Sequence, residues 1–157
     1  MDIKIRKGTK DDVPAALALV KELATYEKEP EAVITTVESM LKDGFSEKPI
    51  YYLHVAELDG EVVGIAIYFI MYSTWKGRCL YLDDIVITEK HRRKGIGNLL
   101  FDEIVRETKK LNCKQMHWQV LDWNEPAINF YKKYNANLDG EWINGKLNME
   151  QIKNFES

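Results

Sequence analysis

A chain of 157 residues, 45% of them apolar and 30% charged, has the size of one domain and the composition of an ordinary globular protein. Its net charge of −3 argues against nucleic acid as the main partner and suits a cationic ligand. No apolar run is long enough to cross a bilayer, and residues 1–12 are charged, unlike a signal peptide. We therefore expect one domain over residues 1–157, located in the cytoplasm and not in a membrane.

In chain order, the hydrophobic periodicity predicts a strand over residues 3–6, a helix over 10–24, a short helix over 35–42, strands over 51–58, 61–71 and 79–88, a helix over 95–110, a strand over 114–121, a helix over 124–134 and a strand over 142–147. Capping boxes are expected at Thr9 with Asp12 and at Thr35 with Glu38. Asp59-Gly60 is typical of a hairpin turn, and Asn148 is expected to cap a last helical turn. This order predicts an α/β domain with helices on both faces of one mixed sheet.

The two cysteines, Cys79 and Cys113, lie in apolar runs and are expected to be buried thiols in a reducing compartment. The sequence has no Cys-x-x-Cys pair and no Cys/His spacing typical of zinc ligation. We therefore expect no metal site.

Asp83 and Asp84 are adjacent carboxylates inside the otherwise apolar strand of residues 79–88. Because successive side chains of a strand point to opposite faces, at least one of the two carboxylates risks burial. A strand end or a bulge would turn both side chains to water. A general base or a cation pocket would use them for chemistry, and the pair alone does not separate these two interpretations.

Residues 90–98 place a basic cluster and two glycines directly before a predicted helix. Such a turn aims backbone N–H groups at one point, at the positive end of the helix dipole, and phosphate is its natural ligand. A solvated basic loop is the alternative. A dinucleotide-binding Rossmann turn does not fit, because its third Gly or Ala falls on Leu100.

The chain resembles the GNAT acetyltransferases, whose acetyl-CoA signature Arg/Gln-x-x-Gly-x-Gly/Ala is matched by Arg92-x-x-Gly95-x-Gly97. Within that superfamily it is most similar to the spermidine/spermine and thialysine acetyltransferase group, nearly from end to end. The matching stretches are residues 21–27, 43–45, 72–78, 81–84, 121–124 and 129–131, which read KELATYE, DGF, YSTWKGR, YLDD, LDWN and NFY.

The resemblance implies a GNAT fold and acetyl-CoA as co-substrate, with pantetheine along the strand and pyrophosphate on the Gly-rich loop. The implied cofactor-binding residues are Ile85, Val86, Ile87, Arg92, Arg93, Lys94, Gly95, Ile96, Gly97, Asn98, Asn124, Glu125, Pro126, Ala127 and Tyr134. Tyr131, which by itself reads as a core or interface aromatic, aligns with the general acid that protonates the leaving thiolate. Asp83 aligns with the group that deprotonates the amine through water.

The resemblance also implies a pocket for a small primary amine. Its implied residues are Tyr26, Glu27, Trp75, Asp83, Asp84, His117, Trp118, Gln119, Glu141 and Trp142. Two departures from the family pattern are Asn135, where Gly is usual, and Ser73-Thr74, where polyamine-specific members carry an acidic residue. The latter favours a thialysine-like amino acid or a diamine over spermine.

The sequence thus predicts an N-acetyltransferase that acetylates a small amine by direct attack in a ternary complex. A polyamine acetyltransferase, a CoA-binding regulatory module without turnover, and an enzyme acting on protein N-termini or lysines are the alternatives. The resemblance, together with four tryptophans and eight tyrosines, also predicts a homodimer.

Overall fold

The computed structural model describes residues 2–156, and these fall into two compact units, one ending at Gln119 and the other beginning at Val120. That residues 1–157 form a single domain stays a prediction. Within the described residues no helix is both long and apolar enough to cross a membrane.

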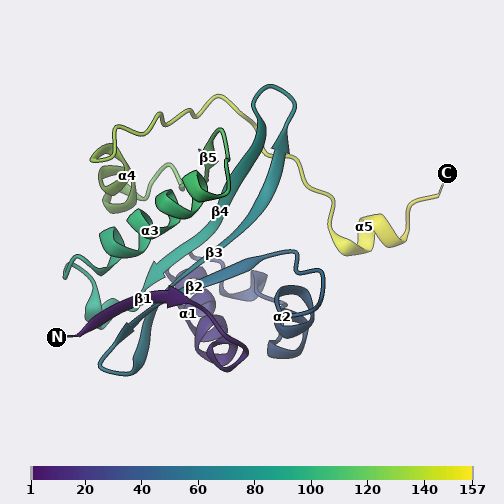
Figure 1. Ribbon diagram of the computed structural model, residues 1–157. Helices are drawn as coiled ribbons and strands as arrows, with labels where there is room; N and C mark the ends of the chain where they lie inside the picture. The colour runs from purple at the N-terminus through teal and green to yellow at the C-terminus, as the bar shows by residue number, and fades with distance from the viewer. Residues whose placement is uncertain (1, 157) are drawn as a thin grey trace. The chain divides into compact units, whose positions relative to one another are not determined.

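The first unit is built on a five-stranded sheet in the order β1-β2-β3-β4-β5 (Figure 1). The strands are β1 (Ile3–Lys7), β2 (Tyr52–Leu58), β3 (Glu61–Ser73), β4 (Gly77–Ile87) and β5 (Met116–His117). Neighbours from β1 to β4 pair antiparallel, whereas β4 and β5 pair parallel. The helices are α1 (Val13–Tyr26), α2 (Val37–Gly44) and α3 (Ile96–Lys110), with short 3-10 turns at Lys10–Asp12, Pro30–Ala32 and Glu89–His91.

Helices cover both faces of this sheet, as the sequence predicted. Leu53 and Val55 of β2 belong to the buried cluster that includes Val13 and Leu17 of α1. The residue between them, His54, points to the other face and lies in the field of Glu107 on α3. The alternation of strand side chains therefore divides the core into an α1 side and an α3 side.

Local signals explain where several elements begin and end. Asp59 (φ 50°) and Gly60 (φ 87°) both adopt the left-handed conformation that a tight two-residue hairpin needs, which confirms the predicted turn. The Asp12 carboxylate accepts a hydrogen bond from the Thr9 N–H at 2.7 Å, as the first capping box predicted. The prediction of the second capping box was wrong by one residue: Thr36, not Thr35, caps α2.

The partner of that second cap also differs from the prediction. The Thr36 side chain accepts from the Ser39 N–H at 3.1 Å, and the Ser39 hydroxyl accepts from the Thr36 N–H at 3.0 Å, so Glu38 takes no part. Ser39 is a short polar residue at the third helical position, where it reaches back as a Glu or Gln would.

The second unit contains α4 (Glu125–Lys132) and α5 (Met149–Lys153). Asn124 caps α4 and Asn148 caps α5, the latter as predicted. Of the predicted strands, one is shorter in the structure than expected and one does not form. The strand expected over residues 114–121 shrinks to β5, and residues 142–147 form no strand, since strand pairing needs a neighbour that this stretch lacks within residues 2–156.

Candidate active site

The two adjacent carboxylates of β4 lie at a β-bulge. Ile67 of β3 pairs with Asp84, but the next residue of β3, Tyr68, pairs with Leu82, so Asp83 is the extra residue. The bulge reverses which face the strand presents: Leu82 pairs on the α3 side, whereas Val86 joins the core of the α1 side. Bulges of this kind re-aim side chains next to active sites.

An acidic cluster surrounds this bulge. Asp84 is half-buried, and burial, the Asp83 charge and the Glu27 charge together raise its pKa to about 7. Glu27 follows directly on α1, and burial raises the pKa of its carboxyl as well. Asp83 is exposed at the surface, yet loss of part of its hydration still raises the pKa of its carboxyl.

The charges of this cluster act on one another: those of Asp83 and Glu27 raise the pKa of Asp84. Two like charges on adjacent residues cannot both ionise easily, so Asp83 and Asp84 titrate as a coupled pair. A carboxyl with a pKa close to the working pH can accept a proton from an ammonium group or a water and later release it. The cluster is therefore able both to attract a cation and to deprotonate it.

The part of β4 that follows the bulge has one open edge. Ile85, Val86 and Ile87 pair with β3 on one side. On the other side β5 pairs only with Leu80 and Tyr81, so no strand within residues 2–156 covers residues 85–87 there. The backbone N–H and C=O groups along this edge can receive an extended ligand as an added strand.

The loop after β4 leads into the amino end of α3. Gly95 stands at the N-cap in the left-handed conformation (φ 78°), and no side chain caps the helix there. The first N–H groups of such a helix have no partner within it and attract an anion. Arg93 (φ 62°) and Lys94 add positive charge at this point, and Ile96, Gly97 and Asn98 form the first turn.

One side chain that the sequence did not single out, Glu22 of α1, holds this loop in place. Its carboxylate accepts hydrogen bonds from the Thr88 hydroxyl at 3.0 Å and the Glu89 N–H at 2.8 Å. It also lies 3.6 Å from the guanidinium of Arg92. Nothing local in the sequence marks Glu22, because its partners lie 66 or more positions away.

The Arg92 side chain is held by contacts with β4 and α1 and does not extend into solvent. Its Nε donates to the Ile87 carbonyl at 2.9 Å, and its guanidinium carbon lies 5.2 Å from the centre of the Tyr26 ring. Because Glu22 also neutralises it, Arg92 shapes the loop while Arg93 and Lys94 carry the charge that faces outward.

Other predicted substrate residues of the first unit occupy different surroundings. The His117 ring packs edge-on against Tyr81, with 5.3 Å between ring centres, and Tyr81 precedes the bulge. The Trp118 ring packs against Phe101 of α3, and Gln119 ends the unit. Trp75 is 83% exposed on the β3–β4 turn, nine positions before Asp84, a separation of about 30 Å along an extended chain. The structure does not bring Trp75 to the acidic cluster.

The second unit carries the remaining predicted residues. The Asn124 side chain accepts from the Ala127 N–H at 3.4 Å, and Glu125, Pro126 and Ala127 form the first turn of α4. Tyr131 is buried near the end of this helix. The Phe130 ring lies between those of Tyr131 and Tyr134, at 5.3 and 5.5 Å.

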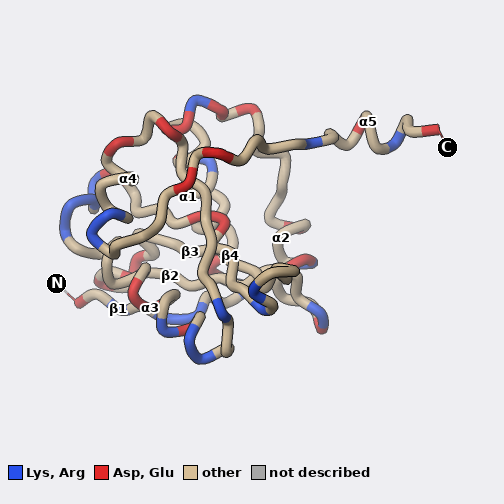
Figure 2. Tube along the Cα trace, turned by 90° about the horizontal axis from the view of Figure 1, so that it is seen from above, with Lys and Arg blue, Asp and Glu red and all other residues tan. Residues whose placement is uncertain are grey.

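Beyond α4 the chain turns at Asn135, whose φ of 55° confirms that Asn can replace Gly there. Farther on, the Trp142 indole donates to Asp139 at 3.0 Å, and both Trp142 and Glu141 are exposed. In residues 2–156 no group of three or more His, Cys, Asp or Glu side chains could hold a metal ion. Basic and acidic residues are interspersed along the chain (Figure 2).

An open strand edge leads to an uncapped, basic helix terminus beside a cluster of carboxyls with raised pKa values. This arrangement is suited to a class of protein that binds an extended phosphorylated ligand and a cation. Residues 16–136 match the model of the acetyltransferase (GNAT) family. The chain belongs to this family and is an acetyltransferase.

Curated relatives cover most of the chain. The thialysine N-epsilon-acetyltransferase of Bos taurus is 38% identical over 142 residues, which is 85% of this chain and 84% of that protein. The spermidine/spermine N(1)-acetyltransferase-like protein 1 of Homo sapiens is 32% identical over 95% of this chain and 23% of its own length. A solved integron cassette protein of V. cholerae has the same fold, with a TM-score of 0.78 and 23% identity over 98% of this chain and 96% of that one.

Proposed function

We propose that this protein transfers an acetyl group from acetyl-CoA to a small primary amine, a thialysine-like amino acid or a diamine, by direct attack in a ternary complex. The observation that carries the proposal is the acidic bulge at Asp83 and Asp84, which runs directly into the open edge at Ile85–Ile87. The group that takes up a proton and the edge that receives the acyl donor are therefore consecutive in one strand.

The cofactor would bind through backbone groups and one helix terminus. Pantetheine amides are suited to pair with the open edge of Ile85, Val86 and Ile87, as a short added strand. The pyrophosphate would lie at the amino end of α3, where the dipole and the N–H groups of residues 95–98 favour anions. Arg93 and Lys94 would neutralise its charge.

The amine must lose a proton before it attacks, because an alkylammonium has no lone pair. Asp83 is the exposed member of the pair and would take this proton through a water, while Asp84 behind it holds or releases the shared proton. The raised pKa of Asp84, about 7, suits this exchange at neutral pH. Glu27 would attract a second positive charge of the substrate.

Tyr131 would supply the proton that the leaving CoA thiolate needs. A phenol has an ordinary pKa near 10 and so remains protonated at pH 7. Tyr131 is buried, with 6% of its surface exposed.

Charge counting favours a short amine over a tetra-amine. Once the Asp83–Asp84 pair is assigned to proton transfer, Glu27 is the main carboxylate left for a distal ammonium in the first unit. Ser73 and Thr74 add hydrogen-bonding groups but no charge. The relatives named for thialysine acetylation support an amino-acid substrate, whereas the relative named for spermidine and spermine supports the alternative.

The test is kcat/KM for thialysine, lysine, putrescine, spermidine and spermine at one pH and salt concentration. We expect thialysine or putrescine to exceed spermine. A tenfold preference for spermine, about 1.4 kcal/mol in transition-state binding, would instead identify the protein as a polyamine acetyltransferase. Binding of acetyl-CoA without turnover of any amine would leave only a regulatory module.

We also propose a homodimer, supported by an apolar segment at residues 142–155. Its large apolar side chains are between 62% and 97% exposed: Trp142, Ile143, Leu147, Met149, Ile152 and Phe155. So much exposed apolar surface marks an interaction site. Light scattering should give twice the monomer mass at micromolar concentration, and Ile143→Glu should halve it. A monomeric wild type would refute this assembly.

A further inference from the structure

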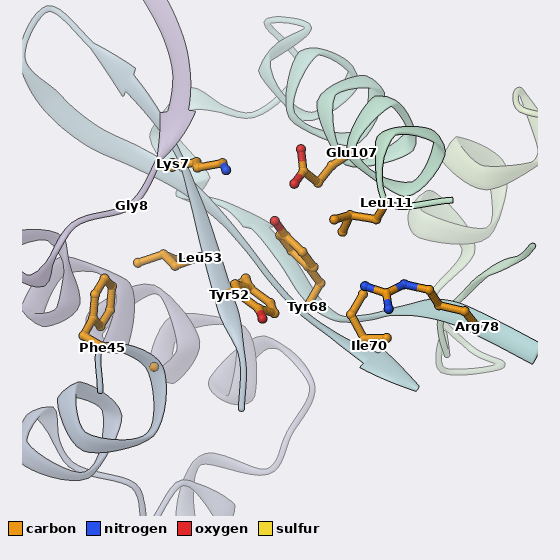
Figure 3. A pocket seen from close by; sticks show the side chains of 11 residues that line it. Lys7, Gly8, Phe45, Tyr52, Leu53, Tyr68, Ile70, Arg78, Glu107 and Leu111 are labelled. Carbon is orange, nitrogen blue, oxygen red and sulfur yellow. The ribbon is translucent and has the colours of Figure 1, made fainter. Parts of the chain in front are cut away.

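A cavity of about 250 Å³ lies where β1 ends and β2 begins, within the first unit, and its lining residues come from both faces of the sheet (Figure 3). It is formed where β1, α2, β2, β3, β4 and α3 meet. Its apolar wall includes Phe45, Leu53, Ile70 and Leu111, and its polar groups belong to Lys7, Tyr52, Tyr68, Arg78 and Glu107. None of these residues belongs to the proposed acetyl-CoA or amine site.

Glu107 is the unusual member of this lining. It is 7% exposed, and no residue within 2–156 forms an ion pair or a side-chain hydrogen bond with its carboxylate. Figure 3 shows the carboxylate directed into the cavity, toward Lys7 and the Tyr68 hydroxyl. A cationic ligand in the cavity would give this carboxylate the partner that it lacks within the described residues.

The neighbours of Glu107 are also incompletely satisfied. The Nδ1 atom of His54 is buried and has no hydrogen-bond partner, and the His54 ring lies 5.5 Å from that of Tyr68. Tyr68 is 2% exposed and stacks on Tyr52 at 5.6 Å. Burial and the nearby Glu107 charge raise the pKa of Tyr68, so its hydroxyl stays protonated as a donor.

The positive groups of the cavity stand at its mouth. Lys7 and Arg78 are exposed, so water and salt screen their charges, whereas Glu107 is largely covered by protein. A ligand that places an ammonium inward and a carboxylate outward would match both signs at once. On the same side of β2 as Glu107, the apolar side chains of Ile70 and Leu111 line the cavity and can contact a short aliphatic side chain (Figure 3).

We propose that this cavity is a second binding site, one that takes a free α-amino acid with a small apolar side chain. The ammonium group contacts the Glu107 carboxylate and the Tyr68 hydroxyl, the carboxylate contacts Lys7, and the side chain packs on the apolar wall. The volume lies below the range of about 300–1,000 Å³ that is usual for drug-sized ligands, which restricts the site to small molecules.

The reporter for this site is the ring of His54, one of only three histidines in the chain. The full-length protein, with histidine labelled in the ring and no acetyl-CoA present, is titrated by NMR with L-leucine. Two analogues separate the charges: 3-methylbutylamine lacks the carboxylate, and 4-methylpentanoate lacks the ammonium. We expect a saturable shift of the His54 signal with L-leucine, a weaker one with the amine, and none with the acid.

Two matched variants on α3 test the role of the buried charge. Glu107→Gln keeps the shape and should weaken L-leucine binding by about tenfold or more, since a buried charged hydrogen bond is lost. Glu103→Gln removes the same charge one turn earlier, where the residue pairs with Arg106, and should leave binding unchanged. Equal melting temperatures of the two variants would exclude a folding defect.

The proposal is overturned if the His54 signal does not move with L-leucine at millimolar concentration, or moves equally in the Glu107→Gln protein. It is also overturned if the acid binds better than the amine, because Lys7 and Arg78 would then govern the site. Acetyl transfer is measured separately on both variants, so failure of the second site leaves the proposed activity testable by itself.

Discussion

The raised pKa of Asp84 predicts that replacing this residue should stabilise the folded protein. In the folded chain its pKa rises from 3.8 to about 7, mainly because burial disfavours the charged form. The folded state therefore holds a proton that the unfolded state releases, so stability falls as the pH rises from about 4 to 7. Asn has the shape of the protonated carboxyl and carries no charge, so Asp84→Asn should not lose this stability.

The size of the effect follows from the shift. A rise of about three pKa units corresponds to about 4 kcal/mol, and partial exposure of Asp84 reduces this to about 2–4 kcal/mol at pH 8. At pH 4 the gain should fall below about 1 kcal/mol, since both states are then largely protonated. Acetyl transfer should decrease in the same variant.

The assay is urea unfolding of the wild type and the Asp84→Asn protein at pH 4, 6 and 8, followed by tryptophan fluorescence. Asp11→Asn is the control, because Asp11 is exposed and should change stability by no more than about 0.5 kcal/mol. A gain that is independent of pH, or a loss of stability at pH 8, would refute the reasoning.

Three further predictions concern the catalytic machinery. Tyr131→Phe should lower kcat by about a hundredfold or more with acetyl-CoA affinity kept, as expected for loss of a general acid; turnover within about twofold of wild type would remove this role. Gly97→Glu should abolish CoA binding in calorimetry, because it places a negative side chain where phosphate would lie, and unchanged affinity in the folded variant would disprove the phosphate site. Glu22→Gln should raise the KM for acetyl-CoA by about tenfold, because it loosens the contacts to Thr88, Glu89 and Arg92. The control Glu38→Gln lies on the exposed face of α2 and should have no effect on that KM.

Local patterns predicted most of the fold because the hydrophobic alternation and the turn residues are encoded within short windows. Asp59-Gly60 specified its hairpin, and the break in an apolar strand marked Asp83 and Asp84. The pattern could not show the bulge, since a bulge is a relation between β4 and β3. At Thr35-Thr36 two adjacent residues could each cap a helix, and only the Ser39 contacts decide between them.

Long-range pairing was beyond the reach of the sequence. Glu22 and Glu107 each look like an ordinary polar residue of an amphipathic helix, and only the tertiary structure shows that one fastens a loop and the other faces a cavity. Residues 142–147 have the composition of a strand, but a strand forms only against a neighbour. Their exposure is what the proposed dimer would explain.

Two aspartates of the first unit show why burial by itself does not identify a functional carboxyl. Asp12 is 7% exposed, yet its pKa is lowered, because Arg6 donates to it at 2.7 and 3.0 Å and the Thr9 N–H at 2.7 Å. At pH values above the pKa that this carboxyl has in the unfolded chain, Asp12 therefore stabilises the corner between β1 and α1. That contribution is lost as the pH falls through the lowered pKa of the folded state.

The pKa of Asp84 shifts in the opposite direction, because burial raises it and the charges of Asp83 and Glu27 add to the rise, where a cation would oppose it. A chain selected only for stability would pair it or replace it with an apolar residue. A cationic substrate of the kind proposed above would supply the missing partner, and the free energy that the unpaired Asp84 costs the folded protein would then contribute to binding of the amine.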